Sequence, residues 1–208
     1  MNENYSAPVV TFARHRLMRD GQGVTTLVCF HGCTLRCKYC LNAFTLSPET
    51  KYQQLTPEQL YAQVKVDDLY FVATGGGVTF GGGEPLLNPD FILRFREICG
   101  DRWHLCAETA LNVPWENVQK VAQCIDVFYI DCKDTNPKIY RSYTGADNSR
   151  MLDNLAKLAK LISPKRIVVR VPLIPGYNTD EDIERTVQHL KEMGIVHFDL
   201  FTYVTDRI

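Results

Sequence analysis

Three closely spaced cysteines are the residues of this sequence best suited to bind a reactive cofactor. Cys33, Cys37 and Cys40 follow the pattern C-x3-C-x2-C in the 208-residue chain. Cysteine thiolates at short local spacings of this kind hold iron–sulfur clusters. Each iron of a four-iron, four-sulfur cluster needs its own ligand, so three thiolates leave one iron open to a small molecule. The spacing therefore favours a reactive site over a plain electron carrier.

Two other uses of these cysteines are less favoured. A structural zinc site usually has four ligands in two closely spaced pairs. His31 could supply a fourth ligand, but the sequence has no distant C-x2-C pair. Disulfides are disfavoured because the N-terminus has no apolar signal region, and such spacing in a protein that is not secreted indicates metal binding or catalysis.

Composition indicates one globular domain spanning residues 1–208. Hydrophobic residues make up 45% of the chain and charged residues 23%, and the net charge is −1. This balance does not indicate nucleic acid as a partner. No apolar run is long enough to span a membrane. Together with eight cysteines, these features predict a reducing, cytoplasmic setting, where an iron–sulfur loop would require scarce oxygen.

Alternating segments predict a parallel sheet. We expect strands at residues 24–30, 104–109, 127–133, 166–172 and 197–204, and one of three or four residues between the glycine triplets 75–77 and 81–83. We expect helices at residues 56–69, 88–98, 115–124, 151–161 and 179–193. Strands that alternate with helices form parallel sheets with right-handed crossovers. Six strands do not close as eight do, so the expected fold is α/β, a partial (β/α)6 barrel that is open on one side.

The cysteine loop follows the first of these strands, where α/β proteins place their active sites. Residues 1–23 form a polar, glycine-punctuated lead-in, which we interpret either as a solvated turn or as a functional segment. The remaining cysteines are scattered over strands and helix ends. Ordinary core packing explains them better than a second cluster does.

The triad resembles the signature of the radical S-adenosylmethionine (SAM) superfamily, in which an aromatic residue, here Tyr39, precedes the last cysteine. A second stretch, Gly82-Gly83-Glu84-Pro85, resembles the GGEP motif of that superfamily. The resemblance implies that the open iron binds the amino and carboxylate groups of SAM and that Tyr39 packs near its adenine. Backbone carbonyls and the Glu84 carboxylate could accept hydrogen bonds from the SAM ammonium group.

Charged residues at later strand ends complete the implied SAM site. The resemblance assigns Lys133 to a carboxylate and Glu108 to ribose hydroxyls, with Asp131 on the same strand face as Lys133. Arg170 could bind a carboxylate, or it could pair with Asp131 or Glu108. A purely structural network of these ion pairs is the alternative. The loop that begins at Ile174 resembles the one that brushes the adenine, although a simple Pro-Gly turn also fits it.

Within the superfamily the chain most resembles the activating enzymes of glycyl-radical enzymes, in particular pyruvate formate-lyase activating enzyme. Short matches occur in the same order, including Asp20-Gly21-Gln22-Gly23 for DGPG, Tyr39-Cys40-Leu41-Asn42 for YCHN and Asp131-Cys132-Lys133 for DLK. Glu108 replaces the family's aspartate, and Val204 replaces a SAM-contacting histidine. The ferredoxin-like insert of some relatives and the family's C-terminal tail have no counterpart.

This resemblance implies a SAM-dependent radical oxidoreductase with a [4Fe-4S] cluster. Such an enzyme forms a 5′-deoxyadenosyl radical and abstracts hydrogen from a glycine of a large glycyl-radical enzyme. It takes its electron from a flavodoxin or a ferredoxin-type donor. A radical SAM enzyme that acts on a small molecule or nucleoside is the main alternative, and a non-catalytic iron–sulfur electron carrier is a further one.

Overall fold

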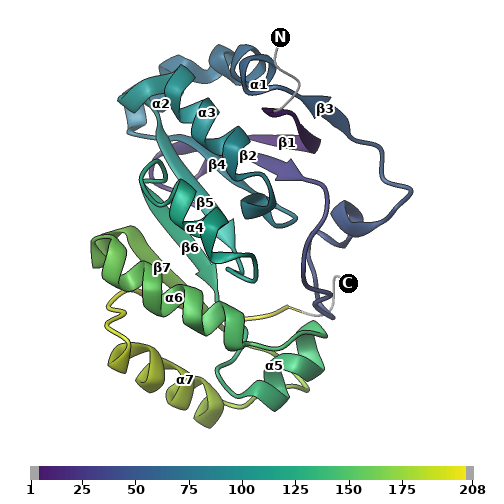
Figure 1. The fold of residues 1–208 in the computed structure, drawn as a ribbon, viewed down its shortest axis with the longest axis vertical. Helices are drawn as coiled ribbons and strands as arrows, with labels where there is room; N and C mark the ends of the chain where they lie inside the picture. Colours follow the sequence, from purple (N-terminus) through teal and green to yellow (C-terminus); the bar gives the residue numbers. More distant parts are fainter. Residues whose placement is uncertain (1–4, 205–208) are drawn as a thin grey trace.

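The protein is built on one eight-stranded sheet, described for residues 5–204 by a computed structural model (Figure 1). The strand order is β3-β1-β2-β4-β5-β6-β7-β8. From β2 onward, neighbouring strands run parallel, whereas β1 pairs antiparallel with both β2 and β3. The strands are β1 (Ala7–Leu17), β2 (Val24–Phe30), β3 (Gln53–Leu55), β4 (Gly77–Gly82), β5 (His104–Thr109), β6 (Val127–Asp131), β7 (Ile167–Leu173) and β8 (Phe198–Thr202).

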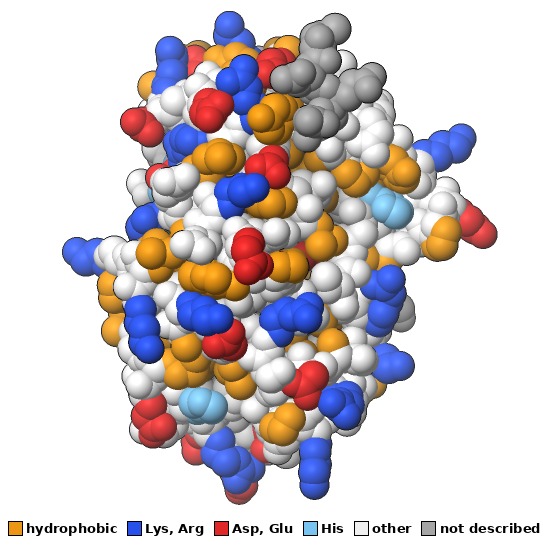
Figure 2. Space-filling view, viewed as in Figure 1, with side chains coloured by type: hydrophobic (Ala, Val, Ile, Leu, Met, Phe, Trp, Pro, Cys, Tyr) orange, Lys and Arg blue, Asp and Glu red, His pale blue; other side chains and the backbone are white. Residues whose placement is uncertain are grey.

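Helices join the successive parallel strands. In Figure 1, α3, α4 and α6 follow one another along the sheet in the order of the strands that they connect. On the face shown in Figure 2, acidic and basic side chains are both scattered over the surface. The helices are α1 (Pro57–Val64), α2 (Asp68–Thr74), α3 (Pro89–Cys99), α4 (Trp115–Val121), α5 (Pro137–Thr144), α6 (Ser149–Leu161) and α7 (Asp180–Glu192).

The predicted open barrel is confirmed. Along the described chain, β3 pairs only with β1 and β8 pairs only with β7, so the sheet ends in two edges. The core lies between strands and helices, where the Phe80 ring packs 5.5 Å from Phe95 and 6.0 Å from Phe30, measured between ring centroids. Each fully buried side chain of this size stabilises the fold by about 1.5–3 kcal/mol. No helix among residues 5–204 is long and apolar enough to cross a membrane.

Strand β1 was not predicted. Residues 7–17 form a strand where the sequence indicated a polar lead-in, and β3 extends the sheet beyond it. Only Ala7 and Val9 of β1 are buried, and its other side chains are partly or fully exposed. The strand lies next to the edge strand β3. The period-2 pattern of a half-buried strand is therefore too weak here to be recognised.

Two predicted boundaries were wrong, and one helix was not predicted. The helix expected at residues 56–69 is two helices, and Leu69 is 76% exposed on α2 instead of extending the buried stripe of α1. Strand β4 has six residues because Gly77, Gly81 and Gly82 take part in it. Helix α5 was missed because its buried residues are Tyr140, Tyr143 and Thr144, which do not form an aliphatic stripe.

Two strands bring the cysteine loop and the Gly82-Gly83-Glu84-Pro85 turn together. Phe30, the last residue of β2, lies opposite Gly82, the last residue of β4. Beyond the strands, the Gly83 N–H donates to the Phe30 carbonyl at 3.0 Å and the Glu84 N–H donates to the Gly32 carbonyl at 2.8 Å. A Cβ on Gly83 would lie 2.0 Å from the Gly32 oxygen, so only glycine permits this approach.

We expect Gly83→Ala to destabilise the protein by about 1–3 kcal/mol, because overpacking at this junction must push the two loops apart. Gly194→Ala is the matched control. Gly194 has a left-handed conformation, with φ of +89°, and a Cβ there meets nothing within 4 Å, so Gly194→Ala adds backbone strain without a steric contact. Urea unfolding of both variants measures the difference. Equal losses would show that the loop contact does not constrain the fold.

Candidate functional site

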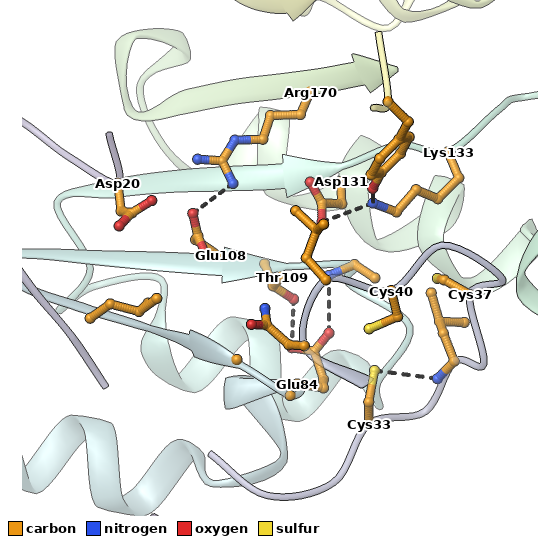
Figure 3. A pocket seen from close by; sticks show the side chains of 18 of the residues that line it. Asp20, Cys33, Cys37, Cys40, Glu84, Glu108, Thr109, Asp131, Lys133 and Arg170 are labelled. Atoms are coloured by element: carbon orange, nitrogen blue, oxygen red, sulfur yellow. Dashed lines mark hydrogen bonds and ion pairs between the residues drawn. The ribbon is translucent and has the colours of Figure 1, made fainter. Parts of the chain in front are cut away.

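A cavity of about 560 Å³ opens at the carboxyl ends of the parallel strands. Figure 3 shows Cys33, Cys37 and Cys40 on one side of it and Asp20, Glu108 and Arg170 on the other. The lining residues come from segments that are far apart in the sequence, from Arg16 to Tyr203. This is the edge at which parallel α/β folds bind their ligands.

The three cysteines line the cavity on a loop that the backbone fastens at several points. The Arg36 N–H donates to the Thr144 carbonyl at 2.9 Å, and the Leu35 N–H donates to the Cys33 Sγ at 3.4 Å. Burial raises the pKa of Cys33 to about 12 and that of Cys37 to about 11. Both are therefore protonated thiols near neutral pH, and a bound metal would have to displace their protons.

No group of three or more His, Cys, Asp or Glu side chains within residues 5–204 is arranged to hold a single metal ion. A [4Fe-4S] cluster makes a different demand, because each thiolate binds a different iron.

Glu84 is buried and serves as an internal anchor. Its Oε1 accepts hydrogen bonds from the Thr109 hydroxyl at 2.7 Å and the Leu86 N–H at 3.1 Å, and its Oε2 accepts one from the Ala110 N–H at 3.0 Å. Burial raises the pKa of Glu84 to about 7, although these hydrogen bonds oppose the rise. The Glu84 carboxylate thus joins the Gly82-Gly83-Glu84-Pro85 turn to the end of β5. It also lines the cavity.

Lys133 is a buried cation held by two partners. Its Nζ lies 3.0 Å from the Asp131 Oδ2 and donates to the Tyr203 hydroxyl at 2.9 Å. Burial alone would lower the pKa of Lys133, but Asp131 and Tyr203 outweigh it and raise the pKa well above its usual value. The ammonium group is therefore charged and held at the cavity wall.

Glu108 and Arg170 form a second ion pair inside the barrel. The Arg170 guanidinium lies 2.6 Å from the Glu108 Oε1 and 3.6 Å from the Asp199 Oδ2. It also stacks over the Tyr129 ring at 4.8 Å from the centroid. This geometry agrees with the structural ion pair that the sequence left open for Arg170, and it leaves both partners at the surface of the cavity.

Several lining residues were not predicted. Arg16 and Asp20 form an ion pair at the far end of the cavity, with one nitrogen–oxygen distance of 3.0 Å. Asp199 and Phe201 enter from β8, the edge strand. The Asp20-Gly21-Gln22-Gly23 match was the signal available for Asp20. A Cβ on Gly21 would meet the Thr25 and Cys106 side chains at 3.1 and 3.2 Å. The turn at residues 20–23 therefore packs closely against the side chains of β2 and β5.

Two predicted residues lie outside the cavity lining. Ile174 is fully buried, its N–H donates to the Asn178 Oδ1 at 2.6 Å, and its carbonyl accepts from the Tyr177 N–H at 3.0 Å. Its side chain therefore does not line the cavity, and the contact of this loop with the adenine stays a prediction. Tyr39 is half-buried and packs on Tyr177 at 5.8 Å between centroids, with its hydroxyl donating to the Pro175 carbonyl at 3.3 Å. Leu27, Leu35, Leu41 and Phe201 supply the larger apolar side chains of the lining instead.

The charges that line the cavity favour a cationic ligand. The basic residues in the lining are Arg16, Lys133 and Arg170, whereas the acidic ones are Asp20, Glu84, Glu108, Asp131 and Asp199. A cavity with excess carboxylate attracts positive charge. A ligand with a sulfonium and an ammonium group, balanced by one carboxylate, suits this arrangement.

Comparison with known proteins identifies the family. A family model described as the radical SAM superfamily matches residues 27–190. The chain belongs to this superfamily. Radical SAM proteins use a [4Fe-4S] cluster and SAM, so these are its cofactors.

Curated radical SAM relatives are activating enzymes. The chain is 32% identical to the (2S)-3-sulfopropanediol dehydratase activating enzyme of Klebsiella oxytoca, over 88% of this chain and 58% of that one. It is 31% identical to the pyruvate formate-lyase-activating enzyme of Clostridium pasteurianum, over 89% of this chain and 78% of that one. The chain thus spans little more than half the length of the first relative.

Solved structures support the same radical SAM fold. SuiB of Streptococcus suis bound to S-adenosylmethionine superposes with a TM-score of 0.64 at 16% identity, over 86% of this chain and 43% of that one. At this identity the likeness establishes the fold alone.

We expect Glu84 to make the cofactor-free protein less stable as pH rises from about 5 to 8. Its pKa is raised from 4.5 to about 7 in the folded chain. Over that interval the folded state retains a proton that the unfolded state has released, so the free energy of unfolding falls as pH rises. Relative to Glu84→Gln, which cannot titrate, the wild type should lose ~2–3 kcal/mol. Urea unfolding across this pH range would contradict the assignment if both proteins showed equal pH slopes.

Proposed function

We propose that Cys33, Cys37 and Cys40 ligate three irons of the [4Fe-4S] cluster and that SAM occupies the adjoining cavity. The observation that carries this proposal is the junction of the two motif loops, through the 2.8 Å hydrogen bond from the Glu84 N–H to the Gly32 carbonyl. It sets the cysteine loop beside the Gly82-Gly83-Glu84-Pro85 turn at the mouth of a cavity of about 560 Å³. Small-molecule sites commonly have volumes of about 300–1,000 Å³.

The residues around the cavity fit the polar groups of SAM. Lys133 presents a charged ammonium that suits the SAM carboxylate. The backbone of Gly82 and Gly83 reaches the cavity without side chains and can accept hydrogen bonds from the SAM ammonium. Glu108 and Asp131 offer carboxylates to the ribose hydroxyls, and Arg170 holds Glu108 in place.

This assignment revises the roles of three residues. The carboxylate oxygens of Glu84 already accept three hydrogen bonds, so Glu84 mainly holds the turn whose backbone faces the SAM ammonium. Ile174 lies outside the cavity, and Tyr39 acts through packing behind the cysteine loop. Phe201, which lines the cavity from β8, is better placed to contact an apolar part of the ligand.

The bound cofactors supply reductive cleavage of SAM, which yields methionine and a 5′-deoxyadenosyl radical. The chain itself binds, orients and shields the reactants. Its charged side chains are held in pairs before any ligand arrives, as in Lys133 with Asp131 and Arg170 with Glu108. Positioning of this kind lowers the barrier of a reaction between two bound groups.

We propose that the hydrogen donor is a glycine in a loop of a large glycyl-radical enzyme. The matched relatives are named as activating enzymes, including those of (2S)-3-sulfopropanediol dehydratase and pyruvate formate-lyase. The open sheet supports a protein substrate, because the edge strand β8 contributes Asp199 and Phe201 to the cavity wall. A loop from another protein could therefore reach the cavity without crossing a closed barrel.

The electron would come from a flavodoxin or a ferredoxin-type donor in a reducing, oxygen-poor cytoplasm. Support for the compartment comes from the cysteines, all of which are free thiols in the fold. A radical SAM enzyme that acts on a small molecule would share the same cofactor site. The two are distinguished by whether the abstracted hydrogen comes from the target glycine.

We expect Cys37→Ala to lose the cluster, because two thiolates cannot hold the third iron. Iron per chain after anaerobic reconstitution should fall well below four, and SAM cleavage should be abolished. Cys124→Ala is the matched control, because Cys124 is a buried thiol just after helix α4 and does not line the cavity. Normal cluster content and SAM cleavage in Cys37→Ala would refute the ligand assignment.

We expect the reduced protein with SAM to generate a stable glycyl radical on a co-encoded glycyl-radical enzyme, seen by electron paramagnetic resonance. Deuterium at the target glycine should appear in 5′-deoxyadenosine, because the glycine hydrogen is transferred directly. The control is the same partner with its target glycine replaced by alanine. If SAM is consumed and the label stays in the partner, hydrogen is taken from another molecule, and the small-molecule alternative replaces the activase.

A further inference from the structure

Strand β1 contains a bulge beside the cavity. Its pairing with β2 is irregular between Ala13 and Arg16, which lie opposite Leu27 and Thr25. Two residues of β1 stand between these pairs, whereas only one residue of β2 does. This is the arrangement of a β-bulge, which bends a strand and changes the direction of its side chains.

The bulge determines which side chain of β1 faces the cavity. Opposite residues of an antiparallel pair point to the same face of the sheet, and Leu27 lines the cavity. Thr25 lies on the same face as Leu27, because side chains alternate along a strand. Arg16, opposite Thr25, therefore also faces the cavity. In a strand without the extra residue, His15 would lie opposite Thr25 and Arg16 would face away.

The carboxylate of Asp67 holds the bulge. Asp67 lies immediately before α2 and is 1% exposed. It accepts a hydrogen bond from the Arg14 Nε at 2.7 Å, and it lies 2.9 Å from the His15 Nε2. The hydroxyl of Thr26, the residue of β2 opposite the bulge, donates to it at 3.3 Å. Consecutive side chains of a regular strand point to opposite faces, so the bulge is what lets Arg14 and His15 reach one carboxylate.

This carboxylate offsets an unfavourable backbone conformation. His15 has φ of +55°, a left-handed conformation that is unfavourable for a residue with a Cβ. The hydrogen bond from Arg14 lowers the pKa of Asp67, so the carboxylate is charged near neutral pH. Hydrogen bonds to a charged group are stronger than those between neutral groups. Asp67 therefore favours the bulge over a regular strand.

The side chain that the bulge redirects lies at the floor of the cavity, the end nearest the first residues of β2. The Arg16 guanidinium pairs with the Asp20 carboxylate through two nitrogens, one of them 3.0 Å from the Asp20 Oδ1. Arg16 lies beside Thr25, whereas the cysteine loop leaves β2 after Phe30, about 16 Å further along an extended strand. Figure 3 shows Asp20 across the cavity from the cysteines. The cavity therefore extends from the cysteines to this ion pair.

We propose that Arg16 binds a backbone carbonyl of the partner's glycine loop at the floor of the cavity, and that Asp67 is the positioning residue that turns Arg16 toward it. This inference rests on the proposed activation of a glycyl-radical enzyme. It adds to that function a side chain that recognises the peptide backbone around the target glycine. It also adds a residue outside the cavity that acts through this side chain.

The charge of the ion pair specifies the kind of ligand. A guanidinium has more N–H donors than one carboxylate can occupy, and within residues 5–204 the Arg16 guanidinium donates to Asp20 alone. Asp20 balances its charge, and the cavity is already rich in carboxylates, so a neutral acceptor suits the remaining donors better than another anion does. A peptide carbonyl is such an acceptor. A glycine has no side chain to keep its backbone from approaching closely.

The test measures glycyl-radical formation on the co-encoded partner by electron paramagnetic resonance at increasing partner concentrations. Asp67→Asn removes the charge that holds Arg14 and His15. We expect its KM for the partner to rise about tenfold or more, the loss typical of a hydrogen bond to a charged group. The kcat and the KM for SAM should change much less. An unchanged KM for the partner overturns the proposal.

Deletion of His15 separates positioning from a general effect on stability. It removes the extra residue, so a regular strand then places Arg16 opposite Thr25 without help from Asp67. In the Asp67→Asn background, the deletion should restore a low KM for the partner. If the KM stays as high as in Asp67→Asn alone, Asp67 does not act through the position of Arg16, and the proposal is wrong.

Arg16→Met removes the proposed donor directly. The KM for the partner should rise by about the same factor as in Asp67→Asn. The two changes together should add little, because both remove the same contact. A rise in the KM for SAM in place of the KM for the partner would assign Arg16 to the cofactor and refute its role in binding the loop.

Asp68→Asn is the matched control. The neighbouring carboxylate of Asp68 binds Arg102 at 2.6 Å and the Trp103 Nε1 at 2.8 Å instead of β1, so the KM for the partner should not change. If Asp67→Asn does not fold, Arg16→Met and the deletion of His15 alone provide the test. The deletion alone should leave the KM for the partner low, and a large rise would overturn the proposal.

Failure of this inference can be told apart from failure of the proposed function. A wild-type protein that forms no glycyl radical on the partner would contradict the proposed function itself. Normal radical formation, with an unchanged KM for the partner in both Asp67→Asn and Arg16→Met, would overturn only the roles assigned to these two residues.

Discussion

The parallel pairing of β2 with β4 is the constraint on which the rest of the site depends. Its register places Phe30 opposite Gly82, so the loops that follow the two strands leave the sheet side by side. Hydrogen bonds from the N–H groups of Gly83 and Glu84 then join these loops. These bonds pair backbone groups that lie beyond the ladder of the two strands and would otherwise need another partner. The glycine at position 83 is required by the close approach to the Gly32 carbonyl.

The interior beside this junction is unusually polar for a buried space, and its charges are arranged in pairs. Lys133 with Asp131 and Arg170 with Glu108 offset the desolvation of each partner. The same pairing holds the side chains in place for a charged ligand, so little reorganisation is needed on binding. Glu84 is likewise held before a ligand binds, because its carboxylate oxygens accept hydrogen bonds from Thr109 and Ala110 at the end of β5.

Helix α5 gives the cysteine loop a rigid backing. The loop has no regular structure of its own beyond a short turn, yet its N–H groups reach the carbonyls of Tyr143 and Thr144. Burial keeps the Cys33 and Cys37 thiols protonated in the cofactor-free protein. Metal binding therefore changes the charge of a region that is already packed.

The sequence by itself determined the chemistry and the class of fold. The spacing of Cys33, Cys37 and Cys40 limits the cofactors that the loop can hold, and the alternation of apolar strands with capped helices specifies an open parallel sheet. Both signals are local, so they can be recognised in short segments. The charged strand ends at Glu108, Asp131, Lys133 and Arg170 were also found, because strand ends in parallel folds meet at one edge.

Tertiary structure alone decided which residues complete the site. Arg16, Asp199 and Phe201 enter the cavity from segments far apart in the sequence, and nothing in their local sequence indicates that they converge. Ile174 follows a strand that ends at this edge but is turned into the core, an orientation set by the packing of the loop. The anchoring role of Glu84 and the contact between α5 and the cysteine loop are also long-range. Both depend on hydrogen bonds between segments that are far apart in the sequence, and no pattern within a short segment predicts such bonds.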